Sequence, residues 1–64
     1  MLDAERIRGL LEARGYEVFK WYDADLGDVL EARVEGRVVA RVVRYQDLKE
    51  ALRALADELG VPVP

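Results

Sequence analysis

Two short segments on either side of the dipeptide Glu35-Gly36 limit the fold of this chain more than any other feature. In both segments, residues 28–34 and 38–43, every second residue is apolar: Leu30, Ala32 and Val34 before the dipeptide, and Val38, Ala40 and Val42 after it. Such alternation is typical of β-strands that bury one face. The glycine between the segments is typical of a hairpin loop. The sequence therefore predicts an antiparallel hairpin.

The length of the hairpin connection decides whether the two apolar sets share a face. Directly opposite residues of an antiparallel pair lie on the same face. A two-residue turn at Glu35-Gly36 would set Ala32 opposite Val39 and would place the two sets on opposite faces. A three-residue connection restores agreement, with Gly36 in the left-handed bulge position. We therefore predict a three-residue or bulged turn, and an inward face that carries all six residues named above.

Helices are predicted at both ends of the chain. The first is expected from Asp3 to Arg14 and the second from Asp47 to Leu59, because apolar residues recur there at helical spacing. Each predicted helix starts with an aspartate that suits the N-cap position. Each is followed by a glycine, which readily adopts the left-handed conformation that ends helices.

The segment between the first helix and the hairpin completes the fold prediction. Residues 16–22 are rich in aromatic and β-branched side chains and predict a strand, and residues 23–27 predict a turn. The expected order is α-β-β-β-α. We predict an α+β fold, in which a three-stranded antiparallel sheet has two helices on one face and residues 1–64 form a single small domain.

The residue types that are missing exclude many kinds of chemistry. The chain contains no Cys, His, Ser, Thr or Asn. The usual hydroxyl and thiol nucleophiles, imidazole acid–base catalysis, structural zinc sites and disulfides are therefore excluded. Glycine-rich phosphate loops are also absent. A Mg²⁺ site built from carboxylates is the one familiar catalytic device that remains, and we expect no cofactor.

Charge and hydropathy bear on location and partners. The chain has no charged-then-apolar leader and no apolar run near 18 residues, so we expect a cytoplasmic protein without membrane contact. Its formal net charge of −3 does not favour general attraction to nucleic acid or anionic lipid. Arg outnumbers Lys, and heat-labile Asn and Cys are missing, which fits a thermophilic or GC-rich source.

The outward face of the predicted sheet is more apolar than an ordinary solvated surface. It is expected to carry Val29, Glu31, Arg33, Val39, Arg41 and Val43. If Phe19 and Trp21 point towards the helices, as core residues, then Val18, Lys20 and Tyr22 join this outward face. We therefore predict an interface at the following residues: Val18, Tyr22, Val29, Arg33, Val39, Arg41 and Val43.

Small domains often gain stability by self-association. A homo-oligomer, with a dimer favoured, is accordingly our expected partner arrangement, and another protein is possible. Either the open face or an exposed strand edge would make the contact. The alternative is a monomer with scattered surface valines, which need no explanation.

Two polar groupings suggest other ligands. Asp23, Asp25 and Asp28 are spaced closely enough to hold a hard cation, although the EF-hand pattern is not met. The favoured interpretation of these aspartates is a solubilising turn. Tyr22, Lys20, Arg33 and Arg41 combine an aromatic ring with basic groups, as in single-strand nucleic-acid sites. The acidic balance of the chain weighs against nucleic acid as a partner.

Four short segments follow the pattern of a known nuclease family. In residues 10–18 a helix with Leu-Leu leads into Gly-Tyr-x-Val, and residues 27–33 contain an Asp at the start of a strand. Residues 35–37 form a hairpin turn, and residues 39–45 form a strand that ends in Arg-Tyr. Together these segments resemble the core of Mrr-type restriction-endonuclease-like domains, which has the same α-β-β-β-α order.

This resemblance implies the fold together with a lost activity. In that family an Asp and a Glu or Gln bind the metal, and a Lys helps to activate water. Asp28 matches the Asp, but Arg41 stands at the Glu or Gln position and Val43 at the Lys position. A cation repels a metal, and valine cannot polarise water. We therefore expect a non-enzymatic protein. The alternative is a degenerate domain that binds DNA or keeps residual metal-dependent nuclease activity, with Asp28 catalytic.

Overall fold

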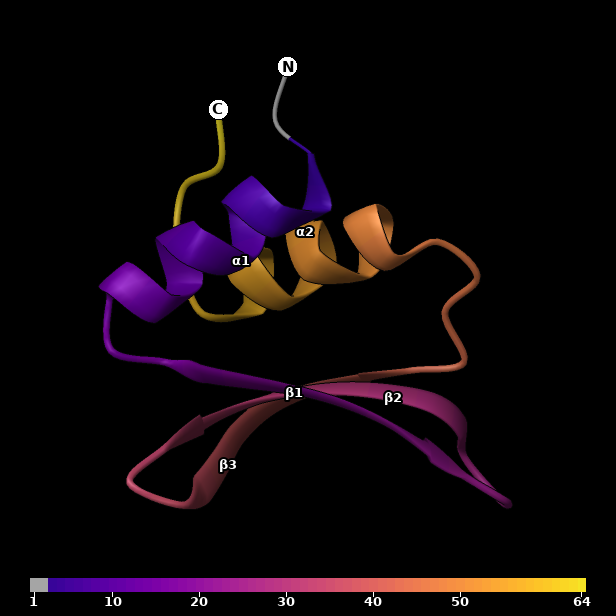
Figure 1. Ribbon diagram of the computed structural model, residues 1–64. Coiled ribbons are helices and arrows are strands. Elements are labelled where there is room, and N and C mark those ends of the chain that lie inside the picture. Colours follow the sequence, from indigo (N-terminus) through magenta and orange to yellow (C-terminus); the bar gives the residue numbers. More distant parts are fainter. Residues whose placement is uncertain (1–2) are drawn as a thin grey trace.

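The computed structural model describes residues 3–64 and confirms the predicted α-β-β-β-α order (Figure 1). The three strands form one antiparallel sheet in the order β1-β2-β3. Both helices lie on the same side of this twisted sheet, and no described element covers its other side. The elements are α1 (Ala4–Ala13), β1 (Glu17–Asp23), β2 (Gly27–Val34), β3 (Arg37–Val43) and α2 (Leu48–Glu58).

The helix ends follow the predicted capping signals. The Asp3 side chain accepts a hydrogen bond from the backbone N–H of Arg6 at 2.9 Å, at the start of α1. The Asp47 side chain caps α2 in the same way. Gly15 and Gly60 follow the helices with φ of 94° and 72°, in the left-handed region that glycine adopts without strain. These short-range interactions explain why both helix boundaries were predictable.

The β2–β3 connection differs from the predicted one. Only Glu35 and Gly36 lie between the strands, and both have positive φ, as in a type I′ turn. The bulge lies inside β3 instead, because Ala32 pairs with Ala40 whereas the next residue, Arg33, pairs with Val38. The three-residue form of the prediction is therefore wrong. The twist of a type I′ turn suits a hairpin, and the bulge in β3 then restores the match between the apolar sets.

This bulge determines which predicted inward residues face the helices. Leu30, Ala32, Ala40 and Val42 do so, as expected. Val38 does not, because it lies opposite Arg33 on the uncovered face, so its predicted inward position is wrong.

The face assignment of β1 is also the reverse of the one expected. Val18 pairs with Ala32, and Lys20 pairs with Leu30. Val18 therefore belongs to the core, and Lys20 and Tyr22 lie on the helix side of the sheet. None of the three is on the uncovered face, where they were expected. Phe19 and Trp21 point to the uncovered side, and their predicted core positions are wrong. The cause is the short loop after β1, which sets Asp23 opposite Gly27 and thereby fixes the register.

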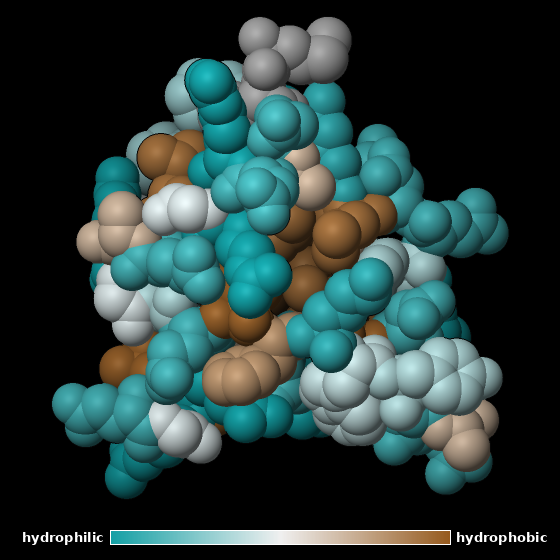
Figure 2. Space-filling view, in the orientation of Figure 1, coloured by the Kyte–Doolittle hydropathy of each residue, from teal (hydrophilic) through white to brown (hydrophobic). Residues whose placement is uncertain are grey.

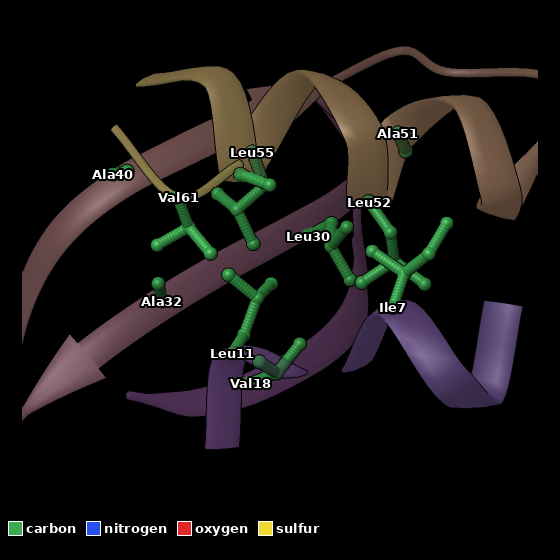
Figure 3. Packing of buried hydrophobic residues seen from close by; sticks show 11 residues of the cluster. Ile7, Leu11, Val18, Leu30, Ala32, Ala40, Ala51, Leu52, Leu55 and Val61 are labelled. Atoms are coloured by element: carbon green, nitrogen blue, oxygen red, sulfur yellow. The ribbon is translucent and has the colours of Figure 1, made fainter. Parts of the chain in front are cut away.

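The hydrophobic core fills the space between the helices and the inner face of the sheet (Figure 3). Helix α1 contributes Ile7 and Leu11, and α2 contributes two leucines and two alanines. Val18 from β1 lies in the same cluster as Leu11 and Leu30. The buried core is aliphatic, and Phe19 and Trp21 of β1 lie on the opposite face of the sheet.

Candidate functional site

The uncovered face of the sheet presents three rows of side chains, each with one residue from every strand. Strand pairing defines these rows. The polar row contains Glu17, Arg33 and Val38. The central row contains Phe19, Glu31 and Arg41. The apolar row contains Trp21, Val29 and Val43. We call these nine residues, together with Val39 of the bulge, the open face.

Glu31 lies at the centre of the open face and is nevertheless only 1% exposed. Its Oε1 accepts hydrogen bonds from Trp21 Nε1 at 3.1 Å and from Arg41 Nε and Nη2 at 3.2 and 3.1 Å. Its Oε2 accepts one from Arg33 Nε at 2.6 Å and forms an ion pair with the same guanidinium. Three neighbouring side chains therefore satisfy a carboxylate that the helices do not touch.

These contacts control the charge of Glu31. Burial alone would raise the pKa of its carboxyl group, because burial disfavours the charged form. Hydrogen bonds from Arg33, Trp21 and Arg41 outweigh burial and hold the pKa below its ordinary value. Glu31 is therefore ionised at neutral pH and neutralises part of the charge of the two arginines.

Val29 shows that the chain shields the centre of this face by itself. It is 0% exposed although it points away from the helices, and its row neighbours are Trp21 and Val43. The Arg33 guanidinium carbon also lies 4.2 Å from the centroid of the Phe19 ring. The centre of the open face is therefore shielded by the chain's own side chains, and Val29 offers no exposed surface to a partner.

The periphery of the open face remains accessible. Its exposed large apolar side chains range from 37% exposure for Trp21 to 49% for Val39, and the group comprises Phe19, Trp21, Val38, Val39 and Val43. Of the predicted interface residues, the structure brings together Val29, Arg33, Val39, Arg41 and Val43. Val18 is instead in the core, and Tyr22 is exposed on the helix side of the sheet.

Sequence reasoning missed Glu17, Phe19, Trp21 and Val38 on the open face, and the two aromatic residues are the largest of these. The signal that would have found the two aromatic residues is the loop before β2. Gly27 has a φ of 79° and pairs with Asp23, which leaves three residues between the paired positions. A glycine with positive φ next to a short hairpin loop is a recognised pattern, and the loop of residues 24–26 places Trp21 opposite Val29.

Of the three aspartates suggested as cation ligands, Asp23 forms hydrogen bonds within the turn after β1. Asp23 Oδ1 accepts hydrogen bonds from the backbone N–H groups of Asp25 and Leu26 at 2.8 and 3.0 Å. These backbone donors lower the pKa of the Asp23 carboxyl group. Among residues 3–64, no three acidic side chains are grouped in a way that would hold a metal ion.

The positions that match the nuclease motif do not converge on one site. Asp28 pairs with Tyr22 and shares the helix side of β2 with Leu30. Arg41 and Val43, at the other two motif positions, belong to the open face. The chain thus places the motif positions on opposite sides of the sheet. The basic and aromatic residues suggested for nucleic acid are divided in the same way. Lys20 and Tyr22 lie on the helix side of the sheet, whereas Arg33 and Arg41 lie on the open face.

A small hollow opens between the helices and β1. Its volume is about 90 Å³, and its lining combines apolar residues such as Leu48 and Leu52 with Glu5, Arg8 and Lys20. Figure 2 shows brown hydrophobic atoms in the middle of this view, ringed by teal hydrophilic side chains. Sites for small molecules usually occupy about 300–1,000 Å³, so this hollow is too small for a typical ligand.

Two general findings complete the description. Within the part of the chain that the structure describes, neither helix has the length and apolar character required to span a bilayer. No family model matches the chain, and comparisons with curated proteins and with solved structures likewise found no match.

Proposed function

We propose that this protein is a non-enzymatic, cytoplasmic interaction module that associates through its open face, with a second copy of the chain as its partner. The observation that carries the proposal is the group of five large apolar side chains, each about 40% exposed, on one uncovered side of the sheet. Trp, Phe and Arg are enriched in the cores of protein interfaces. Contiguous exposed apolar patches on small soluble proteins commonly mark interaction sites.

The net charge of the open face favours a protein, rather than a polyanion such as nucleic acid, as the binding partner. It carries two carboxylates, Glu17 and Glu31, and two guanidinium groups, Arg33 and Arg41, so its formal charge is zero. Nucleic-acid sites depend on excess positive charge that displaces counterions. A neutral face with apolar side chains at its periphery offers no such excess, and it supports contact with another folded chain.

A second copy as partner would cover the uncovered side of the sheet with the same side of the other chain. The strands of this side are seven or eight residues long, and neighbouring strands lie about 4.8 Å apart, so the side is long and narrow. A typical stable interface buries about 800 Å² on each partner, and a contact limited to this side would be at the small end of the range. Packing two such sides together would give a four-layer arrangement, with the sheets about 10 Å apart in the middle.

The strand edges support association less well than the face does. Strand β3 contains the bulge at Val38 and Val39, which interrupts regular pairing along this edge. Strand β1, the other edge, carries Lys20. Bulges and edge lysines are features by which proteins prevent strand addition. We therefore favour association by the face.

Sedimentation of the untagged protein at micromolar concentration tests the proposal. We expect a species of twice 7.3 kDa, and we expect Val43→Asp and Val39→Asp each to convert it to a folded monomer by burying a charge in the contact. Val34→Asp is the matched control, because Val34 is equally exposed but lies at the end of β2 on the helix side. It should remain a dimer.

Two results would contradict the proposal. A wild-type protein that stays at 7.3 kDa up to high micromolar concentration would remove the second copy as partner. Continued association of both aspartate variants would place the contact elsewhere. Circular dichroism on each variant distinguishes loss of association from loss of folding.

The resemblance to Mrr-type domains supplies the alternative, a degenerate domain that binds DNA. Its motif positions lie on both sides of the sheet, and therefore no single surface supports it. Mg²⁺-dependent DNA cleavage that Asp28→Ala abolishes would overturn the non-enzymatic proposal. A labelled duplex that shifts at low salt and dissociates steeply as salt rises would support DNA binding instead.

A further inference from the structure

We draw no further inference here: the strongest candidate, the surface patch of exposed apolar side chains at the periphery of the open face, carries nothing beyond the proposed function, because nothing in the structure of residues 3–64 shows what covers it.

Discussion

The two faces of this sheet reach the same degree of burial by different means. On the helix side, Leu30 and Ala32 are dry because aliphatic residues of both helices cover them. On the open face, Val29 and Glu31 are just as inaccessible, although no helix lies above them. Side chains from the neighbouring strands cover them, with Trp21, Arg33 and Arg41 bonded to the central carboxylate. A three-stranded sheet can therefore close the centre of an uncovered face with its own long side chains.

The two kinds of burial differ in what they contribute to stability. Apolar burial is favourable in proportion to the area removed from water. A buried ion pair must first overcome the loss of hydration of its charges, so its net contribution is smaller. We therefore expect the helix side to carry most of the folding free energy. The Glu31 cluster should mainly hold Trp21 and the two arginines in fixed positions.

Truncation of the aliphatic core should have the largest effect. Leu52→Ala removes a buried side chain between α2 and the sheet and should lower the free energy of unfolding by about 2–5 kcal/mol. Urea denaturation followed by circular dichroism measures this loss. Leu10→Ala, on the partly exposed side of α1, is the control and should cost much less. Equal losses would show that the core does not dominate.

Neutralisation of Glu31 should have an intermediate effect. Glu31→Gln leaves both arginines without their carboxylate and turns an amide N–H₂ towards cationic donors, so we expect a loss of about 1–3 kcal/mol. Glu17→Gln changes the same residue type at an exposed position of the same face and should cost less than about 0.5 kcal/mol. Equal urea midpoints for the two variants would refute the structural role of the Glu31 cluster.

Acidification should remove the contribution that the Glu31 cluster makes to the stability of the folded protein. Because the pKa of Glu31 is lower in the folded state, its contribution is fully present above the unfolded pKa, which is about 4.3 for glutamate. That contribution is lost as the pH falls through the folded pKa. The wild type should therefore lose more stability than Glu31→Gln as the pH falls below about 4.3 and through the lowered folded pKa of Glu31. Asp23, whose pKa is also lowered, affects both proteins alike.

Removal of the Tyr45 hydroxyl group, on the helix side of the sheet, should change the stability least. The hydroxyl oxygen of Tyr45 is buried and has no hydrogen-bond partner within residues 3–64, and burial together with the charge of Asp28 raises its pKa. Removing an unsatisfied buried group is neutral or stabilising, so Tyr45→Phe should raise the melting temperature slightly or leave it unchanged. A clear fall relative to Tyr16→Phe would show that this hydroxyl group has a partner in solution.

Residues at the element boundaries show what could be predicted from the sequence. Asp3 and Asp47 cap the helices, and Gly15 and Gly60 follow their ends, because these signals act over one helical turn. The alternation around Glu35-Gly36 identified the hairpin, and most of its inward set was correct. Five of the seven residues predicted for the interface do lie on the open face.

The open face itself was predicted only in part, because its composition depends on strand register. The expectation for Phe19 and Trp21 rested on size and hydrophobicity alone, and the loop before Gly27 reversed it. The bulge in β3 moved Val38 to the other side of the sheet. Neither feature changes the local pattern of apolar residues, and a slip of one residue exchanges the two faces of a strand.

The amino-acid sequence by itself thus determined the order of elements, the helix ends and the exclusion of most catalytic chemistry, since these depend on neighbouring residues or on residue types that are absent. Only the tertiary structure decided that Glu31 is a buried ionic centre and that Trp21 lies beside it. The physical reason is that side chains ten residues apart in sequence meet only after turn conformation and strand register have been set.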